Sequence, residues 1–247
     1  MEVDIEVEGT HKPLNQGHCA SLCGGFGVAG LVGQVCGNGA VDNAKHLAHD
    51  GGLLGMAAVV TRTGWSAEIG YEIYLRDGNR GEELWERVME AGKPHQIRPT
   101  GPCDIRRIEA GILNHGTDIT LDNNPFEVGL GWQVDKEKQA DYIGKEALER
   151  IRNEGVSRKL VGVEIEGDPI EFSATRWKVE VNGSAAGHIT SAIYSPRMGK
   201  NIGYAMLPIE HAALGNQVTV MVEDLQPRSA TVVRKPFVDP KKDIPKS

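Results

Sequence analysis

Apolar and polar positions along the chain alternate with two different periods, and each period predicts one type of element. Val3, Ile5 and Val7 alternate with acidic residues, which is the period of two expected for a half-buried strand. Short β-rich runs at 56–60 and 71–75 predict two more strands. The N-terminal part of the chain therefore contains sheet strands.

Helical spacing follows these strands. Apolar residues repeat with a helical period at 79–91, 101–113 and 145–152, which predicts three helices. Asn79 is expected to cap the first of them, and Gly92 stands where a helix C-cap belongs.

Residues 18–52 follow neither period, and we assign no element to them. Residues 25–30 have the glycine spacing of a dinucleotide-binding loop, but no strand leads into them and the glycines that follow disfavour a helix. We therefore expect an irregular segment without a nicotinamide cofactor. Six soft side chains in the same region lack the paired spacing of a zinc site, so we expect free thiols and no metal. They are His18, Cys19, Cys23, Cys36, His46 and His49.

From Lys159 onwards the pattern is mostly that of strands. An Asn182-Gly183 pair predicts a hairpin turn between two of them. The fold class is therefore α+β, with a first domain at 1–154 and a C-terminal β-barrel domain at 155–247, joined by turn-rich residues. The strands are expected at 159–166, 176–181, directly after the turn, and near 202–207, 217–223 and 229–234.

Composition narrows the class of protein. The chain has 247 residues and a net charge of -7, so a nucleic-acid backbone is not an expected partner. No apolar run approaches membrane-spanning length, and we expect no membrane partner. The acidic N-terminus lacks the features of a signal peptide, so a cytoplasmic location is expected.

Residues 61–73 carry the candidate chemistry. On a strand, Tyr71 and Ile73 share one face, and Glu72 and Tyr74 share the other. Glu72 therefore points away from the apolar face. Spacing alone leaves open whether Glu72 is a binding residue or an ordinary solvated glutamate.

This segment resembles the Arg-Thr-Gly-aromatic-x-x-Glu-x-Gly-x-Glu-Ile signature of the glycine-cleavage T-protein family, the aminomethyltransferases. Further blocks resemble the motifs of that family in the same order along the chain. They are residues 106–111, 114–119, 124–132, 142–148, 187–191, 195–196, 201–203 and 236–238.

The resemblance implies that the first domain is part of a tetrahydrofolate-binding domain. It implies that Glu72 anchors the pterin, because a carboxylate can accept two adjacent N–H groups in a charge-assisted pair. It makes Trp65 an aromatic wall of the site and suggests that Arg62 and Glu68 shape the loop, with Glu68 on its more exposed part. The catalytic acidic residue is expected in the N-terminal half of the family, upstream of what this sequence matches, so we expect weak turnover from this chain alone.

Two positions depart from the aminomethyltransferase pattern: Cys103 stands where an arginine is usual, and Lys242 where an aromatic residue is usual. These departures imply a tetrahydrofolate-dependent one-carbon transferase that demethylates a small methylated sulfonium or amine, similar to dimethylsulfoniopropionate demethylase. Trp65 would suit such a cation through cation–π attraction. One alternative is the glycine-cleavage aminomethyltransferase, which would need a lipoyl carrier protein. Another is a folate-binding protein without transfer activity.

Overall fold

The structure is a computed structural model that divides into two compact units. Unit 1 contains Met1–Arg106 and Lys241–Ser247, and unit 2 contains Arg107–Pro240. The domain boundary at 154/155 stays a prediction, and residues 107–157 belong to unit 2. The residues described are 2–7, 49–53, 55–61, 64–101, 103–222 and 226–244, with only the backbone described for 2–7 and 49–53.

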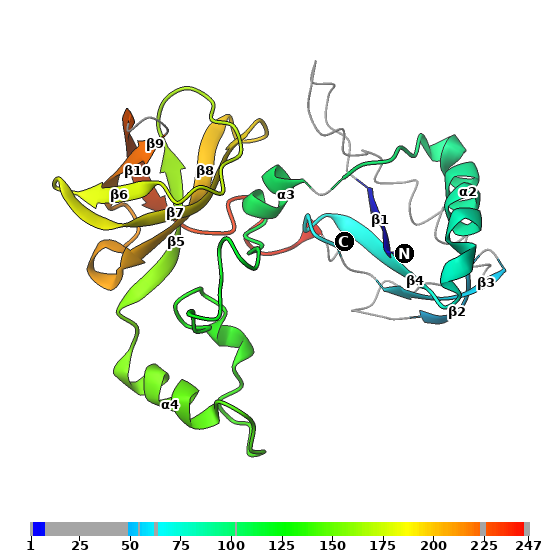
Figure 1. Cartoon of the computed structure of the whole chain (residues 1–247), viewed down its shortest axis with the longest axis horizontal. Coiled ribbons are helices and arrows are strands. Elements are labelled where there is room, and N and C mark those ends of the chain that lie inside the picture. Colours follow the sequence, from blue (N-terminus) through cyan, green and yellow to red (C-terminus); the bar gives the residue numbers. More distant parts are fainter. Residues whose placement is uncertain are drawn as a thin grey trace. The chain divides into compact units, whose positions relative to one another are not determined.

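Unit 1 is built on an antiparallel sheet of four strands in the order β1-β4-β3-β2 (Figure 1). The strands predicted from the N-terminal alternation and from the two β-rich runs are confirmed as β1, β3 and β4. β2 was missed, because its sequence His-Asp-Gly-Gly-Leu has no apolar alternation. The bounds are β1 Glu2–Val7, β2 His49–Leu53, β3 Met56–Thr61 and β4 Ile69–Leu75.

Helix α2 (Gly81–Gly92) covers one face of this sheet. Leu84 and Val88 share a buried core with Met56, Ala58 and Ile73 of β3 and β4. The predicted helix is confirmed, but its start differs. A short 3-10 helix, η1 (Gly78–Arg80), precedes α2 and is capped by Asp77. The predicted cap at Asn79 was wrong, because Asn79 lies within η1 and α2 begins after Arg80 without a side-chain cap. A second 3-10 helix, η2 (Lys93–His95), follows α2.

Unit 2 contains a closed antiparallel barrel with the strand order β10-β5-β8-β7-β6-β9 (Figure 1). The predicted α+β class and C-terminal barrel are confirmed. Asn182 and Gly183 both have positive φ angles, 51° and 76°, as the predicted hairpin turn between β6 and β7 requires. The strands are β5 Arg158–Ile165, β6 Lys178–Val181, β7 Ser184–Ser195, β8 Lys200–Pro208, β9 Gln217–Val222 and β10 Gln226–Val233.

Helix α3 (Asp104–Glu109) is much shorter than the predicted helix at 101–113. Gly111 has a φ of +73° and ends it, with the Ile112 N–H donating to Arg107 O at 2.8 Å and the Gly111 N–H to Ile108 O at 3.0 Å. A Cβ at Gly111 would lie 3.2 Å from Pro236 Cα, so the turn needs a glycine for space as well as conformation.

Three further short elements complete unit 2. Helix α4 (Lys145–Glu154) is confirmed near its predicted position and ends at Gly155, whose φ is +83°. The others are the 3-10 helices η3 (Gly131–Gln133) and η4 (Ile209–His211). Among the described residues, no helix combines the length and apolar character needed to cross a bilayer.

Candidate functional site

The face of the unit 1 sheet that lies away from α2 carries Glu72. Ile73 is buried in the core under α2, and the alternation of β4 turns its neighbours Glu72 and Tyr74 to the opposite face. Within the sheet, Glu72 is paired with Asp4 of β1 on one side and with Thr61 of β3 on the other. The strand register therefore places Glu72 on an interior strand of the sheet, between two neighbours.

The protein satisfies only part of the hydrogen-bonding capacity of the Glu72 carboxylate. Its side chain is half-buried, and Oε2 accepts a hydrogen bond of 2.5 Å from the Tyr74 hydroxyl. Among the described residues, no cation pairs with Glu72 and no donor contacts Oε1. The Oγ1 atom of neighbouring Thr61 is buried and has no hydrogen-bond partner within the described part of the chain. Glu72 Oε1 thus retains hydrogen-bonding capacity that a polar ligand can satisfy, whereas the buried Thr61 hydroxyl is closed to a ligand unless its surroundings move.

The loop before β4 is more buried at Glu68 than the sequence predicted. Glu68 is 8% exposed, and its Oε1 lies 3.4 Å from Arg106 Nη1, so the expectation of an exposed glutamate was wrong. The turn is tight: Ala67 has a φ of +58°, and the Glu68 N–H donates to Ser66 Oγ at 3.3 Å. This turn directs Glu68 into unit 1, while Trp65 is 38% exposed.

Several residues singled out from the sequence lie outside the described part of the chain. Arg62 is one of them, so its role in shaping the loop stays a prediction. The glycine-rich stretch 25–30 and the candidate soft ligands from His18 to His46 are outside it too, and only the backbone of His49 is described. Among the residues that the structure does describe, no cluster of His, Cys, Asp or Glu could hold a metal ion.

Unit 2 contains a buried polar network centred on Asp118. Its carboxylate pairs with Arg107 Nη1 at 2.8 Å, and both side chains are almost completely buried. It also accepts hydrogen bonds from Asn114 N at 2.9 Å and from the hydroxyls of Thr190 and Ser191 at 2.7 Å each. Four donors saturate this carboxylate, so the network stabilises the fold and leaves little capacity for a ligand.

A second buried cation lies near this network. Lys235 Nζ donates to Val128 O at 3.0 Å and lies 5.6 Å from the centre of the Tyr204 ring. Burial lowers the pKa of Lys235 to about 8, an effect that the charge of Lys159 increases and that of Asp118 opposes. Burial likewise raises the pKa of Tyr204, whose hydroxyl lies 3.0 Å from Ile108 O. Through these hydrogen bonds, Lys235 and Tyr204 connect the end of α3 and the loop after it to the barrel.

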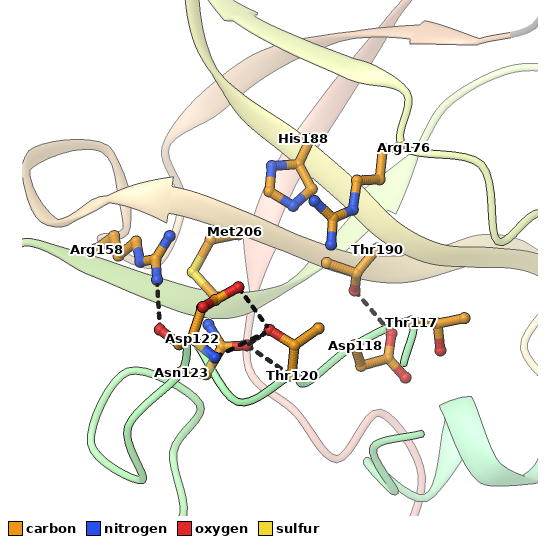
Figure 2. Close-up of a pocket in the computed structure, with 10 residues that line it drawn as sticks. All are labelled: Thr117, Asp118, Thr120, Asp122, Asn123, Arg158, Arg176, His188, Thr190 and Met206. Carbon is orange, nitrogen blue, oxygen red and sulfur yellow. Dashed lines mark hydrogen bonds between the residues drawn. The ribbon is translucent and has the colours of Figure 1, made fainter. Parts of the chain in front are cut away.

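A small polar hollow of about 70 Å³ lies on the barrel beside this network (Figure 2). Arg158, Arg176 and His188 bring nitrogen atoms to it, and Asp122 brings a carboxylate from the loop that includes Thr120. Burial lowers the pKa of His188, and the charges of Arg176 and Arg158 lower it further.

The sequence pattern does not predict this hollow. Its residues are distant along the chain, and only the closing of the barrel brings them together. Pairing of the predicted strands could have placed His188 opposite Met206, which lines the same hollow, but no motif marks the two arginines.

Two protein-family models match the chain, one in its first part and one in its C-terminal part. Residues 36–138 match the GCVT N-terminal domain, and residues 158–239 match the glycine cleavage T-protein C-terminal barrel domain. The first match begins inside the stretch 18–52, to which the sequence pattern gave no element.

Individual proteins agree with these matches. The chain is 36% identical over 187 residues to an aminomethyltransferase from Caldanaerobacter subterraneus subsp. tengcongensis, covering 75% of this chain and 49% of the relative. It is 38% identical over 183 residues to one from Symbiobacterium thermophilum, covering 72% and 47%. The crystal structure of glycine cleavage system aminomethyltransferase T from Bartonella henselae superimposes with a TM-score of 0.72 at 25% identity, covering 86% of this chain and 57% of that one.

The chain spans about half the length of the curated relatives it matches. The family models nevertheless match on both sides of the α4 region, in the order expected from the sequence motifs. The resemblance noted from the motifs is therefore confirmed, and the chain belongs to the glycine-cleavage T-protein family.

Proposed function

We propose that this chain binds tetrahydrofolate and supplies part of an aminomethyl-transfer site, with Glu72 as the pterin anchor. The observation that carries the proposal is the half-buried Glu72 carboxylate, which has one oxygen open among the described residues and lies within the family signature. The names of the relatives favour aminomethyl transfer over the demethylation that Cys103 and Lys242 suggested. The donor would then be an aminomethyl group on a lipoyl carrier protein.

The unused hydrogen-bonding capacity on this sheet suits a pterin. Tetrahydrofolate supplies the nitrogen that accepts the one-carbon unit, and its pterin ring presents adjacent N–H donors. A carboxylate oxygen has two lone pairs, so Glu72 Oε2 can keep its bond from Tyr74 and accept a second donor, while Oε1 accepts another. The Thr61 hydroxyl lies beside Glu72 in the register of β3 and β4, but it is buried, so contact with the ring would require its surroundings to move.

The other predicted site residues take supporting roles in this proposal. Trp65 is exposed enough to offer its ring as a wall against a ligand. Glu68 acts through its buried pair with Arg106, which holds the loop that carries Trp65. Arg62 is proposed to shape the same loop on the strength of the family signature alone.

Substitution of the anchor tests the proposal most directly. Glu72→Gln keeps the shape but removes the charge and turns one acceptor into a donor that faces a donor. Hydrogen bonds to charged groups contribute about 1.5 to 3 kcal/mol, so calorimetry should show a fall in tetrahydrofolate affinity of about tenfold to a hundredfold. The thermal midpoint without ligand should change little, because Glu72 is half-buried and has no cationic partner among the described residues.

The matched control is Glu86→Gln on the exposed face of α2. It makes the same chemical change away from the site and should leave folate affinity unaltered. If Glu72→Gln and Glu86→Gln bind tetrahydrofolate as tightly as the wild type, Glu72 is an ordinary surface residue and the proposed anchor is wrong.

The donor requires a separate assay. The chain is incubated with tetrahydrofolate and either an aminomethyl-loaded lipoyl carrier or a methylated sulfonium, and the folate product is identified. Methylene-tetrahydrofolate from the carrier supports the proposal, and methyl-tetrahydrofolate from the sulfonium supports the demethylase instead. Folate binding without either product would favour the binding protein that lacks transfer activity.

A further inference from the structure

The hollow on the barrel brings together two guanidinium groups and one imidazole from three segments of unit 2. Arg158 begins β5, His188 lies in β7, and Arg176 comes two residues before β6. Lys178 of β6 is paired with His188, so the barrel register itself brings Arg176 towards the imidazole, and the two are adjacent in Figure 2. Strand pairing therefore fixes the backbone positions of Arg158 and His188 and brings the backbone of Arg176 close to them.

The carboxylates around the hollow are already engaged or lie at its edge. Arg158 pairs with Glu127 at 3.2 Å, and it donates a second bond to Asp122 O at 3.0 Å. Asp118 is saturated by its four donors. No carboxylate pairs with Arg176 in the described part of the chain. The N–H groups of Arg176 and the remaining ones of Arg158 are thus the donors available at the hollow.

Charge and size define what can bind. The pKa of His188 is lowered partly by Arg176 and Arg158, which indicates a positive potential at the imidazole. A hollow of about 70 Å³ is well above the roughly 10 to 15 Å³ that one water molecule needs, so it has room for a carboxylate group. The exposed Asp122 side chain adds negative charge, which disfavours a dianion more strongly than a single carboxylate.

We propose that this hollow binds one carboxylate group, held by the guanidinium groups of Arg176 and Arg158. A guanidinium presents a planar pair of N–H donors that matches the two oxygens of a carboxylate. The carboxylate belongs either to a free amino acid, whose ammonium group would face Asp122, or to the end of a larger acid. The site lies entirely in unit 2 and does not depend on folate binding.

The test measures binding of acetate, glycine and inorganic phosphate to the whole chain by NMR titration at constant ionic strength, following the His188 ring protons. Saturable millimolar binding of acetate should raise the pKa of His188, because a bound anion offsets the two arginines. Arg176→Met should weaken acetate binding by about tenfold or more. Even without ligand, this variant should raise the pKa of His188, since one positive charge is removed. Arg176 is exposed, so the fold should be retained.

Arg150→Met is the control, since Arg150 is exposed on α4 and does not line the hollow. Glycine binding more tightly than acetate, with the difference lost in Asp122→Asn, would identify an amino acid as the ligand. Equal affinities would indicate the carboxylate of a larger acid. The proposal is overturned if acetate binding does not saturate, if phosphate binds more tightly than acetate, or if Arg150→Met and Arg176→Met have equal effects.

Discussion

The carboxylates of Asp118 in unit 2 and Glu72 in unit 1 occupy contrasting environments. Asp118 is 2% exposed and receives four donors, including the buried guanidinium of Arg107. Glu72 is half-buried on its sheet and receives one donor, the Tyr74 hydroxyl. A saturated, buried carboxylate contributes to the fold, whereas one with an open oxygen can contribute to binding. Conservation of a residue type within a motif would not by itself distinguish these two uses.

The sharpest test of this contrast is Asp118→Asn. Removing one charge breaks the buried ion pair with Arg107 and turns an amide donor towards existing donors. Breaking a buried pair costs about 3 to 5 kcal/mol, so the thermal midpoint of unit 2 should fall by on the order of 10 °C. Calorimetry of Asp168→Asn, an exposed aspartate of the same unit, provides the control. Equal midpoints for the two variants would mean that the network contributes little to stability.

Lys235→Met should change how stability depends on pH. The folded pKa of about 8 lies below the usual 10.5, so the folded state binds fewer protons than the unfolded state between these values. The stability of the wild type should therefore rise with pH across this window, by up to about 3 kcal/mol relative to Lys235→Met. Urea denaturation at pH 7 and pH 9.5 measures the difference.

The control for Lys235→Met is Lys136→Met, because the Lys136 side chain is 72% exposed. The Lys136 variant should show the same pH dependence as the wild type. A Lys235 variant with an unchanged pH dependence would contradict the burial of its charge.

Glu68→Gln should have a smaller effect, on stability more than on folate binding. The side chain is buried beside Arg106, and loss of its charge should cost about 1 to 3 kcal/mol. The urea midpoint of unit 1 should fall relative to Glu86→Gln, an exposed change in the same unit. An unaltered midpoint would restore the sequence expectation of a solvated loop residue.

Tyr74→Phe should have the smallest effect. It removes the hydroxyl that orients the Glu72 carboxylate and leaves the ring in place. The hydroxyl orients the carboxylate but does not itself contact the ligand in this proposal, so we expect it to contribute only about 0.5 to 1.5 kcal/mol to binding and tetrahydrofolate affinity to fall about twofold to tenfold, less than in Glu72→Gln. Tighter binding in Tyr74→Phe would show that the hydroxyl competes with the ligand for the carboxylate.

The positions of strands and helices could be predicted well where the apolar residues followed a single period, either that of a strand or that of a helix. The sequences of β4 and β9 alternate, so the positions of these strands and the outward direction of Glu72 followed from the pattern, whereas β5 and β8 are buried along most of their length and were predicted from β-rich composition. The helix at 101–113 was extended too far, because a stripe of isoleucines continues past Gly111, whose positive φ ends the helix. Helical spacing could not detect this turn, which depends on the close approach of Pro236.

The sites depended on contacts between distant residues, and the sequence predicted them less well. Glu68 was expected on an exposed loop because its partner Arg106 lies 38 residues away. The hollow with Arg176 and His188 needs the register of a closed barrel before its residues can be recognised as neighbours. The candidate anchor Glu72 came from a local motif, which is why a single sequence could propose it.

The closed order of strands in unit 2 affects whether another polypeptide can pair with the barrel. A strand at the edge of an open sheet offers free backbone groups that can pair with another polypeptide and begin aggregation. In the ring β10-β5-β8-β7-β6-β9, every strand has a neighbour on both sides. Another chain can add a strand there only by first separating two that are already paired, so the barrel resists intermolecular strand pairing through its topology alone.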